Sequence, residues 1–81
     1  MGQEMLEKRV VVILSTGEKR EHRLLVRDDN DYVKSIRYYL RVLSSDPKSV
    51  LGFTLPLCYY KVQNVMAVEF VDPPPAGSRL K

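Results

Sequence analysis

Residues 31–44 are the one segment of this chain with the periodicity of an amphipathic helix, and this limits the fold. The apolar side chains of the segment fall within one arc of the helical wheel, about 120° wide. They are Tyr32, Val33, Ile36, Tyr39, Leu40 and Leu43. Asp28 to Asp31 supply N-capping oxygens and negative charge at the start of the helix, and Pro47 ends it. A single helix of this kind can cover only one face of a sheet.

Four other segments are rich in β-branched and apolar residues, which is typical of strands. They are residues 9–15, 20–27, 50–60 and 65–71. The first is apolar on both faces, as in a central strand, and Thr16–Gly17 predicts a hairpin turn after it. Pro56 has no amide hydrogen to donate, so we expect the third strand to be an edge, to be bulged or to be split in two. The alternation in the last strand places Met66, Val68 and Phe70 on one face.

This order of elements predicts an α+β fold. We expect a β-β-α-β-β two-layer sandwich, with a mainly antiparallel four-stranded sheet and one helix on one face. A chain of 81 residues has room for one domain. We expect an N-terminal arm over residues 1–8, the domain over residues 9–72 and a flexible, proline-rich tail over residues 73–81.

Cysteine usage and hydropathy indicate the compartment. The single cysteine, Cys58, cannot form an internal disulfide, which is typical of a reducing environment. Residues 1–8 are charged and lack the apolar run of a signal peptide, and no segment approaches the roughly 18 apolar residues of a membrane span. We therefore expect a cytoplasmic protein without a membrane partner.

The strand segments carry more apolar residues than one helix can cover. In residues 9–15 and 65–71, apolar side chains point to both faces, so one set is left without cover. A second copy of the chain would cover it, and the apolar, aromatic run from Leu57 to Tyr60 is a further candidate edge. We predict a homo-oligomer, most simply a dimer, and the same surface would also suit a protein partner. The alternative is that loops or the terminal segments fold over this face. The predicted self-association residues are Val11, Ile13, Leu57, Tyr59, Tyr60, Val65 and Ala67.

The polar side of the predicted helix holds a basic and aromatic stripe. Its members, which fall within an arc of about 100°, are Lys34, Arg37, Tyr38 and Arg41. Two of the three excess positive charges of the chain lie in residues 31–45, where Asp31 is the only acid. This arrangement favours an external anion such as a nucleic acid. The alternative interpretation is an ordinary solvated helix face.

A second basic pair, Arg23 and Arg27, points away from Leu24 and Val26 on the predicted second strand. With Tyr59 or Tyr60 these arginines could form a platform for an anion. The simpler interpretation is that they protect an edge strand from pairing with another chain.

The remaining polar residues do not predict catalysis. His22 is the only histidine and has no metal-ligating residue at the required spacing, so we predict no metal, and we expect its neighbours Glu18 and Glu21 on the surface of the hairpin. Cys58 has no neighbouring base in the sequence and is expected in the core. Gly17 and Gly52 are isolated, so no phosphate-binding loop is predicted. We therefore predict no catalytic residues and no cofactor.

Together these patterns predict a non-catalytic interaction or adaptor module that self-associates through an apolar sheet face or edge. The alternative is a nucleic-acid-binding regulatory protein that uses Lys34, Arg37, Tyr38 and Arg41. A third hypothesis is an enzyme or small-molecule binder whose site forms only between subunits.

Overall fold

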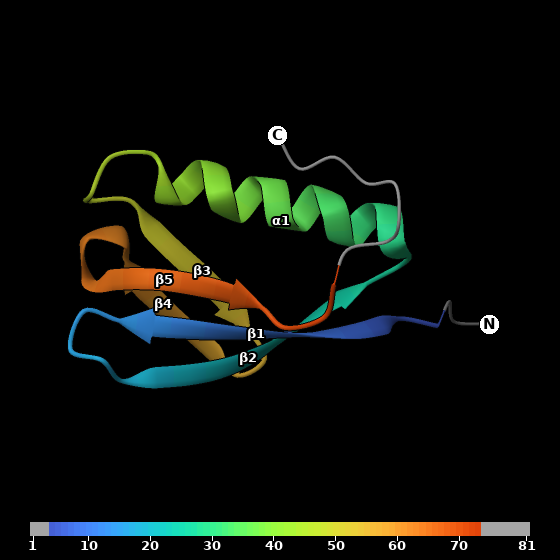
Figure 1. The fold of residues 1–81 in the computed structure, drawn as a ribbon. Coiled ribbons are helices and arrows are strands. Elements are labelled where there is room, and N and C mark those ends of the chain that lie inside the picture. The colour runs from blue at the N-terminus through green and yellow to red at the C-terminus, as the bar shows by residue number, and fades with distance from the viewer. Residues whose placement is uncertain (1–3, 74–81) are drawn as a thin grey trace.

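The structure, a computed structural model, describes residues 4–73 (Figure 1). The predicted α+β class with antiparallel strands is confirmed, but the single four-stranded sheet is wrong. A three-stranded sheet has the order β2-β1-β5, and β3 and β4 form a separate two-stranded sheet. Residues 74–81 of the predicted tail and residues 1–3 of the predicted arm lie outside the described residues. The elements are β1 (Leu6–Leu14), β2 (Lys19–Val26), α1 (Asp29–Leu43), β3 (Val50–Thr54), β4 (Leu57–Lys61), the 3₁₀ helix η1 (Val62–Asn64) and β5 (Val65–Phe70).

The hairpin of β1 and β2 forms as the turn signal predicted. The two strands pair from Leu6 opposite Val26 to Ile13 opposite Lys19. Gly17 adopts a φ of +92° in the turn, a conformation that residues with a Cβ rarely adopt. As its two apolar faces predicted, β1 is the central strand, and it begins at Leu6, within the predicted N-terminal arm.

Pro56 splits the predicted third strand in two. Leu55 and Pro56, joined by a cis peptide bond, form the turn between β3 and β4, and Thr54 then pairs with Leu57. Proline suits this position because it has no amide hydrogen to contribute to a ladder. The tip of the hairpin touches β2, where the Arg23 amide donates to the Leu55 carbonyl at 2.9 Å. This turn makes β3 and β4 an antiparallel hairpin, which forms the two-stranded sheet.

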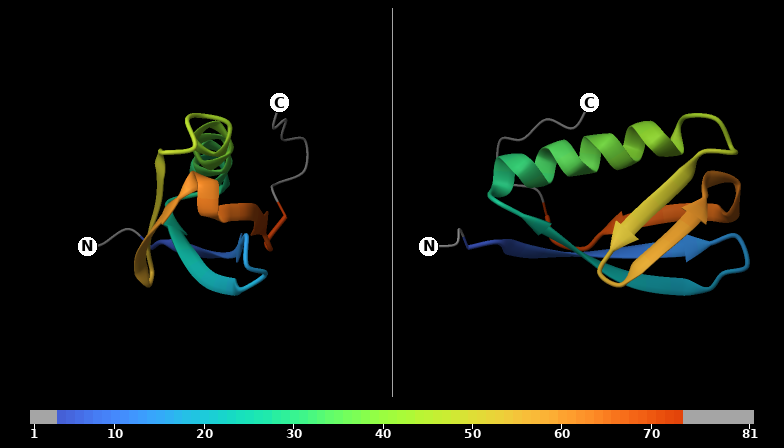
Figure 2. Two further views of the ribbon diagram at one scale, coloured as in Figure 1. Left: turned by 90° about the vertical axis from the view of Figure 1, so that its left-hand side faces the viewer. Right: turned by 180° about the vertical axis from the view of Figure 1, so that it is seen from behind.

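The helix is capped as predicted. The Asp28 side chain accepts a hydrogen bond from the Asp31 amide at 2.8 Å, so the helix begins at Asp29, two residues earlier than expected. Both sheets face α1 (Figure 2), and the core lies between the helix and the two sheets. Its buried residues are Val10, Val12, Leu24, Val26, Tyr32, Ile36, Tyr39, Leu51 and Phe53.

The buried side of α1 differs from the predicted arc at Leu40, which is 41% exposed. Tyr39 determines this orientation of the helix. Its ring stacks on Phe53 with centroids 4.9 Å apart, and its hydroxyl donates to the Gly52 carbonyl at 3.0 Å. Because these contacts draw the Tyr39 side of the helix toward β3, Leu40 turns away from the core.

A bulge changes the predicted faces of β5. Ile13 lies opposite Ala67 and Leu14 opposite Val65, so Met66 is an extra residue in its strand. The prediction that Met66 shares a face with Val68 and Phe70 is therefore wrong. Met66 is 63% exposed, whereas Val65, Val68 and Phe70 pack against the core.

The helix α1 has 15 residues, and no helix within residues 4–73 is long and apolar enough to cross a membrane.

Candidate interaction surfaces

The outer face of the three-stranded sheet, which points away from α1, has a charged half and an apolar half. In the charged half Arg9 pairs with Glu21 at 3.2 Å and Arg23 pairs with Glu7 at 3.3 Å. Hydrogen bonding to Arg9 lowers the pKa of the Glu21 carboxyl. These four residues line a shallow cavity of about 470 Å³ together with Pro56 and Asp72. Since its four arginine and glutamate side chains pair with one another, this cavity does not indicate a catalytic site.

The apolar half of the outer face lies over β1 and β5. Val11 and Ile13 are half-buried there, Ala67 lies opposite Ile13 and is exposed, and Val71 is exposed beyond the end of β5. Within residues 4–73, β5 pairs only with β1, so its other edge has no strand beside it. Glu69, the only charged residue of β5, lies opposite Val11 on the same outer face and is exposed. This free edge and the apolar half together form one surface, which we call the β5 surface.

The opposite edge of the same sheet, along β2, is protected. Most of its exposed positions carry charges, among them Lys19, Glu21 and Arg23, and Leu25 is an exposed apolar residue of the same strand. Arg27, just beyond the strand, lies 3.7 Å from Asp31. Because β2 is an edge strand and Arg23 bonds to the hairpin tip, the interpretation that Arg23 and Arg27 protect an edge fits the topology.

The β3–β4 hairpin has a second exposed apolar face. Leu51 and Phe53 of β3 are buried, whereas Val50, Leu57 and Tyr59 are exposed. The Tyr59 ring lies against Gly52, because a Cβ added at Gly52 would come within 3.0 Å of two ring carbons. Tyr59 is nevertheless 67% exposed, so its ring offers much of its surface to a ligand.

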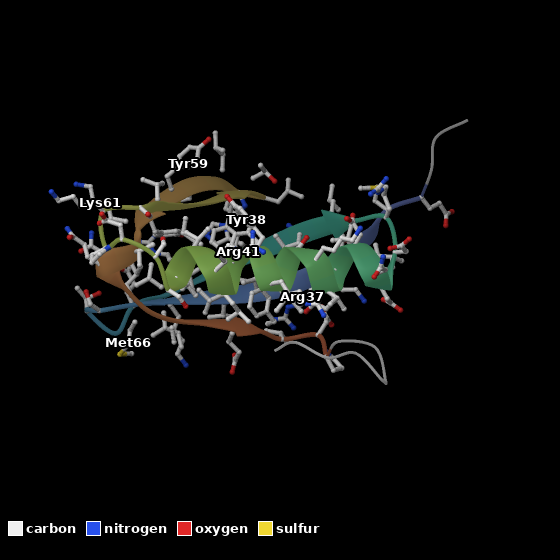
Figure 3. The ribbon with its side chains drawn as sticks, turned by 90° about the horizontal axis from the view of Figure 1, so that it is seen from above. Arg37, Tyr38, Arg41, Tyr59, Lys61 and Met66 are labelled. Carbon is white, nitrogen blue, oxygen red and sulfur yellow. The ribbon has the colours of Figure 1, made fainter. Side chains whose placement is uncertain are left out.

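The basic and aromatic stripe predicted on the helix is exposed along its whole length. The Tyr38 ring packs edge-on against Tyr39, with centroids 5.4 Å apart. Figure 3 shows Tyr38 and Arg41 on the side of the molecule where Tyr59 and Lys61 lie, while Arg37 lies on the other side of the helix axis. The structure thus places part of the stripe on the same side of the molecule as residues of β4 with which the sequence did not associate it.

The predicted self-association residues do not form one surface. Val11, Ile13 and Ala67 belong to the outer face of the three-stranded sheet, and Leu57 and Tyr59 belong to the β3–β4 face. Tyr60 and Val65 pack against the core instead. Tyr60 alternates with Tyr59 in β4, and the bulge at Met66 turns Val65 inward.

His22 is buried, whereas its neighbour Glu21 is exposed. Its Nδ1 lies 3.1 Å from the Pro56 carbonyl and its Nε2 lies 2.6 Å from the Tyr60 hydroxyl. A carbonyl only accepts, so Nδ1 carries the proton and the Tyr60 hydroxyl donates to Nε2. The His22 ring also stacks on Phe53, with centroids 4.5 Å apart. The signal in the sequence was its alternation with Leu24 and Val26, which places all three on the core face.

Burial has opposite effects on the two partners of this hydrogen bond. It lowers the pKa of His22 and raises the pKa of Tyr60 to about 12, because both charged forms lose solvation. A cavity of about 250 Å³ adjoins them, and Arg20 and the half-buried Cys58 also line it. Arg20 pairs with Glu18 at 2.6 Å, and His22 uses both ring nitrogens to join β2 to the hairpin. The contacts of His22, Tyr60 and Arg20 therefore serve the fold.

Comparison of the chain with protein-family models, with curated proteins and with solved structures found no match in any of the three. The function is therefore argued from the surfaces themselves.

No group of three or more histidine, cysteine or acidic residues within residues 4–73 is arranged to hold a metal ion. Two surfaces are left without a structural role: the β5 surface, and the face formed by α1 and the β3–β4 hairpin.

Proposed function

We propose that this chain is a non-catalytic interaction module that forms a homodimer by pairing β5 with β5 of a second copy. The observation that carries the proposal is the β5 edge, a six-residue strand with one charged side chain and no neighbour on its outer side within residues 4–73. The unpaired amide and carbonyl groups of such an edge are a template for another strand.

Antiparallel pairing about a twofold axis would turn two three-stranded sheets into one sheet of the order β2-β1-β5-β5-β1-β2. It would also bring the apolar halves of the two outer faces together. Exposed Met66 and Ala67 would then lie beside the partner's β5 and lose part of their contact with water. Burial of a side chain such as Met66 contributes roughly 1.5–3 kcal/mol, and the twofold axis counts it twice.

The other edges suit this role less well. The β2 edge carries charges of both signs and bonds to the hairpin tip. The edge of β4 is open, but Lys48 and Lys61 stand at the same end of its hairpin. Pairing β4 with its own copy would place Lys61 beside the partner strand and remove part of its hydration, which opposes association.

Sedimentation velocity of matched lysine variants tests the proposal. Met66→Lys places a charge on the β5 edge, whereas Leu57→Lys places the same charge on the β3–β4 face, and the two side chains are similarly exposed. We expect a dimer at tens of micromolar for the unaltered chain and for Leu57→Lys. Met66→Lys should raise the dimer dissociation constant about 100-fold or more, because each copy would lose the burial of Met66 and would place a charged lysine beside the partner strand.

Three outcomes would contradict the proposal. The unaltered chain could be monomeric at these concentrations, the two variants could weaken the dimer equally, or Leu57→Lys alone could abolish it. The last result would assign self-association to the β3–β4 face. Circular dichroism spectra of both variants identify any loss of folding.

A further inference from the structure

The positive charge of the chain is concentrated in one part of the structure. Residues 32–68 contain five Lys or Arg residues and one acid, Asp46, which gives a formal net charge of +4 against +3 for the whole chain. All five ion pairs of the described residues lie within residues 7–31. Four of the cations form no ion pair within residues 4–73, namely Lys34, Arg41, Lys48 and Lys61.

Two exposed tyrosine rings lie in the same region, and a continuous series of contacts connects them. Tyr38 packs against Tyr39, the Tyr39 hydroxyl donates to the Gly52 carbonyl, and Gly52 lies under the ring of Tyr59. Tyr38 is 55% exposed, and both rings stand on the side of the molecule where Arg41 and Lys61 lie (Figure 3). Because Tyr39 is buried between α1 and β3, these contacts connect the two exposed rings through the packed part of the fold.

We propose that this surface, which we call the α1–β4 surface, binds single-stranded nucleic acid. Bases stack on the faces of Tyr38 and Tyr59, and phosphates pair with the surrounding cations. An acidic peptide would match the charge but would leave two exposed aromatic faces without a role. A duplex would match the charge as well, but its bases are already stacked on one another. The contacts use the phosphate and the base and not the sugar, so RNA and DNA bind alike.

This binding is independent of the proposed dimer. Met66, on the β5 surface, lies across the molecule from Tyr59 (Figure 3). Each copy in a β5-paired dimer would keep its own α1–β4 surface, and Met66→Lys should therefore leave the intrinsic affinity of each surface for a short oligonucleotide unchanged.

Fluorescence anisotropy with labelled oligonucleotides of about 12 nucleotides tests the proposal, since single-strand sites in small domains span roughly 4–16 nucleotides. The probes are oligo-dT, oligo-U and the duplex of oligo-dT with oligo-dA. We expect both single strands to bind at about 50 mM salt, and the duplex to bind more weakly. With three or four phosphate contacts, log Kd should rise with log salt concentration with a slope of about 2–3.

Matched variants separate the two kinds of contact. Tyr59→Leu keeps an apolar side chain over Gly52 but removes the ring, and we expect about 5- to 100-fold weaker binding. Tyr59→Phe keeps the ring and should bind within about twofold of the unaltered chain. Lys61→Glu should weaken binding and lower the salt slope by about 0.7. The control Lys19→Glu makes the same change of charge on an exposed strand residue outside this surface and should have a much smaller effect.

The proposal is overturned if neither single strand binds at low salt, or if Lys61→Glu and Lys19→Glu weaken binding equally. It is also overturned if Tyr59→Leu binds like Tyr59→Phe while poly-glutamate displaces the oligonucleotide at equal charge concentration. That result would assign the surface to an acidic protein partner. Thermal unfolding of the Leu and Phe variants shows whether the fold is retained.

Discussion

The two edges of the three-stranded sheet differ in almost every respect that governs association. The β2 edge carries charged side chains and is joined to the β3–β4 hairpin through Arg23 and His22. The β5 edge carries apolar side chains and has no strand beside it within residues 4–73. The polar groups of this small domain thus protect one edge, and its surplus of apolar residues lies at the other. The difference indicates that the β5 edge is the one available to a partner.

The largest expected effect on the free energy of unfolding concerns the side of the domain where β2 is joined to the β3–β4 hairpin. Phe53 stacks on both His22 and Tyr39, so Phe53→Ala should lower the free energy of unfolding by about 3–5 kcal/mol. Phe70→Ala, on the half-buried β5 side, should cost roughly half as much, because less of its ring leaves the core. Urea denaturation measures both values. Equal losses of stability for the two variants would show that Phe53 and Phe70 are packed equally well.

Phe53→Ala alone could unfold a domain of this size, so Phe53→Leu is the milder test. It conserves most of the volume and should cost about 1–1.5 kcal/mol. A Phe53→Leu variant as stable as the unaltered chain would mean that the aromatic stack contributes little.

The hydrogen bond between His22 and Tyr60 comes next. Tyr60→Phe removes the hydroxyl and leaves the buried Nε2 of His22 without a donor, so we expect a loss of about 1–3 kcal/mol in the free energy of unfolding. Tyr59→Phe is the matched control on the exposed face of the same strand and should change stability by less than about 0.5 kcal/mol. If both variants are equally stable, the hydrogen bond between His22 and Tyr60 does not contribute to joining β2 to the hairpin.

His22 also makes the stability of the fold depend on pH. Burial holds its pKa below the 6.5 of an exposed imidazole, so the unfolded chain binds a proton at a higher pH than the folded chain does. Stability should therefore be full above about pH 6.5 and should fall as the pH drops below it. The slope is at most about 1.4 kcal/mol per pH unit until His22 protonates in the folded state.

Urea unfolding between about pH 7.5 and pH 5 measures this dependence above the range in which carboxylates titrate. His22→Phe should have a flat profile over the same interval. A flat profile for the unaltered chain would mean that folding leaves the pKa of His22 near its ordinary value.

The smallest expected effect on folding stability concerns the β5 edge. Ala67 is exposed and makes few contacts with the core, so Ala67→Lys should change the stability of the isolated chain by less than about 0.5 kcal/mol. It should nevertheless abolish the rise of the unfolding midpoint with protein concentration that a dimer produces. A large loss of stability at the lowest measurable concentration would show that Ala67 serves the fold and not association.

The elements that depend on local patterns were predictable from the sequence. The central strand, the hairpin turn at Gly17 and the Asp28 cap each follow from a few neighbouring residues, and all three are present. The burial of His22 was also predictable, because it alternates with Leu24 and Val26 in β2.

Features that depend on distant contacts were not predictable. The exposure of Leu40 follows from the bond between Tyr39 and Gly52, and the exposure of Met66 follows from a shift of pairing between β1 and β5. Neither contact leaves a trace in the local pattern. The same reason explains the candidate surface, since the helical stripe was recognisable at Tyr38 and Arg41 but its continuation at Tyr59 required the fold.

Residue-resolved hydrogen exchange tests the central claim, that the β5 edge pairs with a second copy, most directly. Exchange would be measured at low and at high protein concentration for the amides of β5 and of β4. We expect outward-pointing amides between Val65 and Phe70 to become protected as concentration rises, while the amides between Leu57 and Lys61 exchange at the same rate throughout. If exchange in β5 does not depend on concentration, β5 does not pair with its copy and the claim is wrong.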